Sequence, residues 1–399
     1  MVQKPEIDKK SAIFSLKEFF DSTAFGFMPN QFINVLFYSI LLLSGLGWWI
    51  VALVNSLKHI GSYVSELFLG NYDNKTLLSR IRLFSLFYAF SFFIMIFGLV
   101  YNNYMIFGIG MIFSGISISS QGLLYRRLVK QELKFSYLRE YYSRINFFTL
   151  LSVALTFVSA YLFLRVNSLI IPLEIASISF ILSSYILFRL KPEKKIKELS
   201  QITGFRKLVS EYKNIKVFSK RTIFILALAI INATIILTYS YLGIYIFEQY
   251  KHFYLGHFGN IALVFGISII ASLLFSKKIN YLISNNYGQL PVIIFGISLF
   301  SLIPLSYSQS VDFISLIIAT SVGLMGMSML RISSEIYMIR NNFKSKLNGI
   351  AFSKILLLML ISLYFYQNYT NYFMFLFYSA IVSLILFFGI LIFEQRLTK

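Results

Sequence analysis

Apolar runs of about the length of a membrane-spanning helix alternate with short polar links along the whole chain. A helix needs roughly 20 apolar residues to cross the hydrocarbon core of a bilayer. The runs lie at residues 28–48, 50–70, 83–101, 104–124, 145–165, 169–190, 222–247, 258–276, 289–307, 313–333, 349–367 and 372–393. The pattern predicts an all-α membrane protein with about twelve transmembrane helices. The boundary between the first two helices stays open, because residues 32–54 read as one run.

The links after every second run hold nearly all of the basic residues. With the N-terminus placed inside, 31 of the 36 Lys and Arg residues fall on inner segments. Cytoplasmic links of membrane proteins carry such an excess of positive charge. The charge pattern therefore predicts an even number of spans in the cytoplasmic (plasma) membrane, with both termini and the links at 71–82, 125–144, 191–221 and 334–347 in the cytoplasm.

Composition excludes several classes of protein. The 399 residues are 57% hydrophobic and 13% charged, and their mean hydropathy is +0.73. A soluble domain is about one quarter charged, so lipid must cover much of this surface. The net charge of +20 sits in links that flank apolar spans. It therefore favours the anionic headgroups of the cytoplasmic leaflet as partner and argues against nucleic acid.

Metal and cofactor chemistry find little support in the sequence. The chain has no Cys, so disulfides and thiolate metal sites are excluded. Its three His residues, His59, His252 and His257, form no HExxH motif and no cluster with carboxylates. We expect no metal, no cofactor and no enzymatic activity.

The longest polar link, residues 191–221, divides the chain into two halves of six spans with the same rhythm of links. The predicted domains are a cytoplasmic segment at 1–27, a six-helix bundle at 28–190, the basic linker at 191–221 and a second six-helix bundle with a short tail at 222–399. Transporters are often built from two such pseudo-repeats, with the substrate site between them.

The architecture resembles the major facilitator superfamily over nearly the whole chain. The link after the second span, with Gly70, Asp73, Lys75, Arg80 and Arg82, is similar to the glycine, aspartate and basic motif of that family. The resemblance implies a secondary transporter that rocks its halves around a central site. The fifth span lacks the Gly-Pro motif of the family's drug antiporters, which argues against a drug/proton antiporter.

Ionisable residues inside apolar spans are costly and usually serve function or packing. The candidates for ion coupling or gating are Glu66, Glu174, Arg331, Glu335 and Lys354. Each has an alternative: Glu66 pairing with a basic residue of the next link, Glu174 reaching the outer surface, Arg331 and Glu335 forming a static pair, and Lys354 snorkelling to the interface. Lys58 is mid-span if the first helix ends early, and otherwise we expect it to snorkel.

Polar residues at helical spacing form stripes on several spans. Substrate-cavity candidates are Asn30, Asn34 and Tyr38 on the first span, Ser114, Ser117 and Gln121 on the fourth, and Asn232, Thr234, Thr238, Tyr241 and Tyr245 on the seventh. Spacings of three, four and seven residues put such side chains on one helix face. The alternative is packing between helices, where Ser and Thr are common.

These observations predict a secondary active transporter that moves a small, neutral or amphipathic solute by alternating access, driven by an ion gradient, with protons as the expected coupling ion. A monomer is compatible with the sequence, which leaves the oligomeric state open. One alternative is a lipid-linked glycan flippase, whose cavity should hold several basic residues for a pyrophosphate. A polytopic membrane enzyme and a membrane scaffold without transport are alternatives of a different class. The substrate, the direction of transport and the coupling ion are not encoded in any pattern that can be read here.

Overall fold

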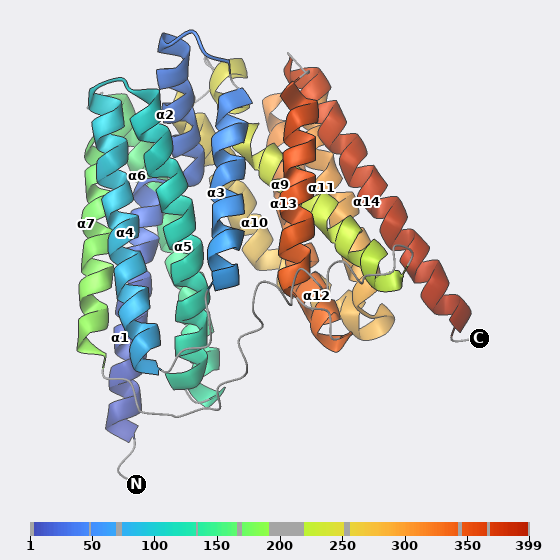
Figure 1. The fold of residues 1–399 in the computed structure, drawn as a ribbon, viewed down its shortest axis with the longest axis horizontal. Coiled ribbons are helices and arrows are strands. Elements are labelled where there is room, and N and C mark those ends of the chain that lie inside the picture. Colours follow the sequence, from blue (N-terminus) through green and yellow to red (C-terminus); the bar gives the residue numbers. More distant parts are fainter. Residues whose placement is uncertain are drawn as a thin grey trace. The chain divides into compact units, whose positions relative to one another are not determined.

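The chain folds into long helices packed side by side, seen in a computed structural model (Figure 1). The structure describes residues 4–47, 49–68, 74–132, 135–165, 170–190, 219–250, 256–341, 345–364 and 368–397, and these hold no β-strand. The chain divides into two compact units, which are described separately. Unit 1 comprises Met1–Ile202 and Tyr254–Ala262, and unit 2 comprises Thr203–Phe253 and Leu263–Lys399.

Unit 1 is a bundle in which successive spans run in alternating directions. Its helices are α1 (Lys4–Phe27), α2 (Asn30–Leu43), α3 (Trp49–Phe68), α4 (Asn74–Val100), α5 (Tyr104–Glu132), α6 (Phe135–Arg165), α7 (Ile170–Ile186) and the short 3-10 helix η1 (Leu187–Arg189). α1 packs against α6 and α7, α4 packs against α5 and α7, and α3 packs against α5 (Figure 1).

The first span is longer than the sequence predicts and is broken in the middle. We expected residues 1–27 to be a cytoplasmic segment, but α1 already begins at Lys4, and residues 10–43 form one stretch apolar enough to cross a membrane. The helix stops at Phe27 because Pro29, which is extended at φ −65° and ψ 149°, has no N–H to continue the hydrogen-bond ladder. Ser159 on α6 donates to the freed carbonyl oxygen of Phe27 at 2.6 Å.

A close contact holds the end of α1 against α6. A Cβ added at Gly26 would lie 2.6 Å from the Cβ of Leu155 and 2.8 Å from the carbonyl oxygen of Ser152. Only glycine leaves room for the two backbones at this distance. After the break, α2 ends at Leu43 and α3 begins at Trp49, so the open boundary falls in the segment between them, which contains Gly45 and Gly47.

Unit 2 repeats the up-and-down arrangement. Its helices are α9 (Lys220–Gln249), α10 (Gly256–Tyr287, whose first residues belong to unit 1), α11 (Gln289–Ser308), α12 (Phe313–Arg340), α13 (Ser345–Tyr364) and α14 (Tyr369–Leu397). α11 packs against α12 and α14, and α9 packs against α13 and α14. Within the described chain, nine stretches are long and apolar enough to span a bilayer. The chain is therefore a multi-pass membrane protein.

Candidate functional site

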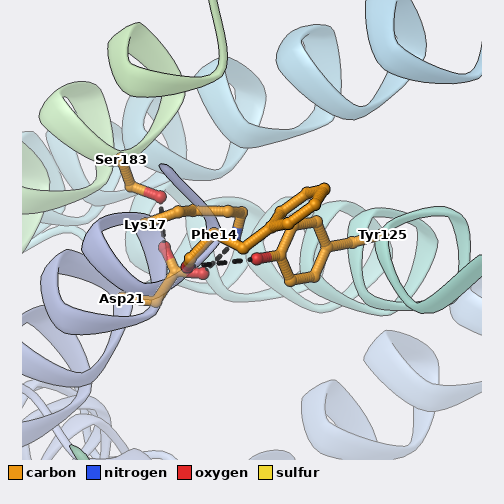
Figure 2. A network of polar contacts seen from close by, with 5 residues as sticks. All are labelled: Phe14, Lys17, Asp21, Tyr125 and Ser183. Carbon is orange, nitrogen blue, oxygen red and sulfur yellow. Dashed lines mark hydrogen bonds and ion pairs between the residues drawn. The ribbon is translucent and has the colours of Figure 1, made fainter. Parts of the chain in front are cut away.

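A network of charged and aromatic side chains is buried inside unit 1, where α1 meets α5 and α7 (Figure 2). Lys17 and Asp21 lie one turn apart on α1 and form an ion pair, with only 1% and 9% of their side chains exposed. Ser183 on α7 donates a hydrogen bond to the other oxygen of Asp21. The ammonium of Lys17 lies 4.0 Å from the ring centre of Tyr125 on α5. The network therefore joins three helices through one carboxylate and one ammonium.

Apolar contacts close the network on its α5 side. Tyr125 packs edge to face against Phe14 of α1, with ring centres 5.7 Å apart, and its hydroxyl donates to the carbonyl oxygen of Phe14 at 3.4 Å. Phe14 and Leu128 are fully buried there. Removing two charges from water costs several kcal/mol for each ion unless close partners offset it. The ring face and the Ser183 hydroxyl are such partners.

A second buried ion pair also joins α1 to α5. Lys10 Nζ lies 2.8 Å from Glu132 Oε2, and their side chains are 8% and 1% exposed. Lys10 is two turns before Lys17 on α1, and Glu132 is about two turns after Tyr125 on α5. Lys10 and Lys17 of α1 thus both interact with α5, Lys10 through the carboxylate of Glu132 and Lys17 through the ring of Tyr125.

Unit 2 carries a related but more exposed arrangement on the corresponding helices. Lys220 at the start of α9 pairs with Glu394 near the end of α14, and its ammonium lies 5.7 Å from the ring centre of Tyr337 on α12. Tyr337 donates to Glu394 at 2.7 Å and stacks on Phe224 of α9. α9, α12 and α14 are the first, fourth and sixth helices of unit 2. α1, α5 and α7 hold the same places in unit 1 when α1 and α2 are counted as one broken span. The side chains of Lys220 and Glu394 are 28% and 33% exposed, so water reaches this pair.

The sequence interpretation missed the buried network because it assigned residues 1–27 to a cytoplasmic segment. The local signal was present. Phe14 and Lys17 are three residues apart, and Lys17 and Asp21 are four apart, so all three fall on one helix face. The Lys and Asp of this face carry opposite charges, which lets an apolar helix contain both.

On the other side of unit 1, polar side chains of the first-span stripe connect α2 to α3. Asn30 Oδ1 accepts a hydrogen bond of 3.1 Å from Lys58 Nζ, and Asn34 Oδ1 accepts one of 3.1 Å from Asn55 Nδ2. Asn34 is buried, Asn30 is exposed and Lys58 is half-buried. Since α2 ends at Leu43, Lys58 lies mid-way along α3. Tyr38, the third member of the stripe, is buried.

Most of the other stripe residues are buried. Ser114, Ser117 and Gln121 on α5 are all buried, and Ser114 donates to the carbonyl oxygen of Met111 on its own helix. On α9, Asn232 is half-buried, whereas Thr234 and Thr238 are fully buried.

The two tyrosines of the α9 stripe lie in an aromatic cluster of unit 2. Tyr241 packs edge to face on Tyr372 of α14 at 4.5 Å, and Tyr245 packs on Tyr307 of α11 and Phe373 of α14. Both tyrosines therefore pack against neighbouring helices. That the polar stripes line a cavity stays a prediction.

The described candidates for coupling and gating lie on the surfaces of their helices. Glu174 on α7, Arg331 and Glu335 on α12, and Lys354 on α13 are all exposed. Among the side chains that the structure describes, no ion pair joins Arg331 to Glu335. The side chain of Glu66 lies outside the described residues, so its role and the gate stay predictions.

The motif-like link is described only in part. Gly70 and Asp73 lie outside the described residues, as does the side chain of Lys75, while Arg80 is half-buried on α4. Arg82 donates to the carbonyl oxygen of Leu187 at 2.6 Å and to that of Leu190 at 3.5 Å. The positive charge of a guanidinium is favourable at the carbonyl end of a helix. Arg82 therefore joins α4 to η1, the short helix that follows α7.

The described residues include no group of three or more His, Asp or Glu side chains placed to hold a metal ion. No protein-family model matches the chain, and no curated protein matches it in sequence.

Solved structures match nearly the full length of the chain at low identity. A nucleoside transporter, NupG, matches with a TM-score of 0.73 at 11% identity, covering 95% of this chain and 99% of its own. A POT family peptide transporter matches with 0.70 at 11%, covering 97% of both chains. A D-xylose-proton symporter matches with 0.64 at 12%, covering 95% and 97%. These neighbours are transporters of the major-facilitator type rather than enzymes. The chain has the fold of the major facilitator superfamily.

Proposed function

We propose that the protein is a secondary active transporter that moves a small solute across the cytoplasmic membrane by alternating access. The observation that carries this proposal is the match of about 95% of the chain to transporters of one fold that are named for different cargoes: nucleosides, peptides and D-xylose. Sequence identity of 11–12% does not indicate which cargo this chain takes.

Reconstitution tests the transport proposal directly. Purified protein in proteoliposomes should exchange a labelled solute from a panel of nucleosides, peptides, sugars and organic acids across the bilayer, and empty liposomes should not. A matched preparation of the protein unfolded by heat serves as control. If no member of the panel crosses faster than in the control, the transport proposal is contradicted.

Coupling to protons is the finer part of the proposal. A carboxylate that alternates between a low-dielectric interior and water binds and releases a proton in each cycle. Glu66 and Glu174 are the carboxylates proposed for this role. Glu174 is exposed on α7, as the fifth residue of that helix, where a proton from the outer side would arrive first under the predicted topology.

The Glu174→Gln variant mimics the protonated state. We expect it to exchange solute across the bilayer but to lose accumulation driven by a pH gradient. Asp312→Asn, a change of one exposed carboxylate outside the apolar stretches, is the matched control and should keep accumulation. If Glu174→Gln and Glu66→Gln both keep pH-driven accumulation, these carboxylates are structural and the coupling ion is not bound by them.

A further inference from the structure

The break between α1 and α2 lies inside the membrane. Residues 10–43 form a single stretch apolar enough to cross a bilayer, and its helix is interrupted between Phe27 and Asn30. A span takes up roughly 20 residues, and every segment of that length within 10–43 includes residues 27–29. The interrupted backbone is therefore within the bilayer wherever the membrane sits along this stretch. Non-helical backbone at such a depth occurs only where it is buried in protein or lines water.

The break leaves three backbone acceptors without donors. Pro29 has no N–H for the carbonyl oxygen of Phe25, four residues earlier. The carbonyl oxygens of Gly26 and Met28 likewise receive no hydrogen bond from the part of the chain that the structure describes. Ser159 donates to the remaining carbonyl at the end of α1. Unsatisfied carbonyls are costly in a bilayer, which supplies no donors, so these three oxygens call for a hydrogen-bonding partner.

The break is reachable from water at Asn30. This residue is exposed, whereas Ile33, Asn34 and Phe37, which follow it on the same helix face, are buried. A face turned to lipid would expose all four positions, so the exposure of Asn30 is local to the break. Polar side chains within a membrane face the protein interior or water rather than lipid. A solute in water can therefore meet Asn30 and the break beside it.

The groups at the break fit a neutral solute that carries hydrogen-bond donors. Asn30 Oδ1 accepts a hydrogen bond of 3.1 Å from Lys58 Nζ, so the amide nitrogen of Asn30 is the end that can donate. Carbonyl oxygens and one amide nitrogen suit hydroxyl and amide groups, which donate and accept at once. The partial negative charge of the carbonyls disfavours an anion, and the ammonium held at Asn30 disfavours a cation.

We propose that the break in the first span is the binding site of the transported solute within unit 1, and that this solute is a neutral molecule with hydroxyl or amide N–H groups. Its donors bind the carbonyl oxygens of Phe25, Gly26 and Met28, and one of its acceptors binds the amide nitrogen of Asn30. A continuous helix would satisfy these carbonyls itself and leave none for a solute. The assignment rests on the proposed transport function and names the substrate class.

Thermal unfolding of the detergent-purified full chain tests the assignment with defined probes. D-ribose, myo-inositol, uridine and N-acetylglycinamide are each compared with an analogue in which every hydroxyl and N–H hydrogen is replaced by a methyl group. Ribose 5-phosphate and tetramethylammonium add an anionic and a cationic probe. We expect at least one neutral probe to raise the unfolding temperature of the wild-type chain while its methylated analogue does not.

Pro29→Ala separates a binding role of the break from a structural one. The restored N–H can bond the Phe25 carbonyl, so this variant should unfold at the same or a higher temperature without solute, yet bind the probe about tenfold more weakly. Pro304→Ala removes a proline from the interior of α11 in unit 2 and should leave binding unchanged. Asn30→Leu removes the amide donor and should weaken binding about threefold to tenfold, as for one hydrogen bond. It keeps the test valid if Pro29→Ala does not fold.

Stabilisation by no neutral probe, equal stabilisation by the methylated analogues, or stabilisation by the phosphate or the ammonium alone would overturn the assignment. Unchanged binding in both Pro29→Ala and Asn30→Leu would also overturn it and place the bound solute elsewhere. If proteoliposomes transport a solute and both variants transport it with unchanged affinity, the transport function stands and the break is a structural feature of the span.

Discussion

Lys17 and Asp21 form a buried ion pair in unit 1, so removing one of the two charges should lower the stability of the protein. Both are buried, and each is the charged partner of the other. Breaking a buried ion pair by removing one partner leaves an uncompensated charge, which costs about 3–5 kcal/mol. We expect Asp21→Asn to lower the stability of the protein by about that amount in thermal or chemical denaturation.

The charge-free double variant Lys17→Met with Asp21→Leu should recover most of this loss, because it removes both charges together. The matched control is Glu394→Gln in unit 2, whose pair with Lys220 is reached by water and should be worth about 0–1 kcal/mol. Equal losses for Asp21→Asn and Glu394→Gln would show that burial does not set the energy of these pairs.

At the scale of single elements, the contact between α1 and α6 depends on Gly26. Gly26→Ala places a Cβ 2.6 Å from that of Leu155, and overpacking of this kind costs about 1–3 kcal/mol. Gly389→Ala on α14 meets no atom within 4 Å and should be neutral or stabilising by up to about 1 kcal/mol, since Ala favours a helix over Gly. Unfolding temperatures of the two variants check this contrast, and a neutral Gly26→Ala would contradict the close approach.

The start of α12 provides a pH-dependent element. Asp312 accepts hydrogen bonds from the hydroxyl and N–H of Ser315 and from the N–H of Ile314, and these bonds lower the pKa of its carboxyl. A carboxyl with a lowered pKa stabilises the fold above its unfolded pKa of about 3.9, and that contribution is lost as the pH falls through the lower folded value.

The expected result is that the unfolding temperature of the wild-type chain falls more steeply below about pH 4 than that of Asp312→Asn. Asn keeps the helix cap but does not titrate there. Parallel curves for the two proteins between pH 3 and pH 6 would show that the cap does not depend on charge.

At the scale of the whole molecule, the alternation of basic links predicts where each segment lies. Because the chain has no Cys, single Cys residues can be introduced without background. A Cys at Ser200, in the central link outside the described residues, should be labelled by a membrane-impermeant reagent only after the cells are opened. Labelling in intact cells would reverse the predicted topology, with a Cys at Gln309, in the predicted outer link at the end of α11, as the positive control for outside labelling.

The sequence by itself determined the class of the protein and its division into long helices. A bilayer requires about the same apolar length of every spanning helix and an excess of positive charge on the cytoplasmic links. Both features can be read along the sequence without knowledge of how the helices pack. That pattern predicted an all-helical membrane protein, and the resemblance of its architecture to the major facilitator superfamily implied the fold of that family, which the structure and the solved neighbours confirm.

Only the tertiary structure decided which polar residues meet. Lys17 and Asp21 fall in a predicted cytoplasmic segment, and the packing of α1 against α7 and beside Tyr125 of α5 buries them. Lys58, open between a mid-span and a snorkelling position, lies mid-way along α3 because α2 ends at Leu43. Tyr241 and Tyr245, for which cavity lining and packing between helices were both open, make aromatic contacts with α11 and α14. Helical spacing gives the face on which a side chain lies, but only the packing of neighbouring helices determines what that face meets.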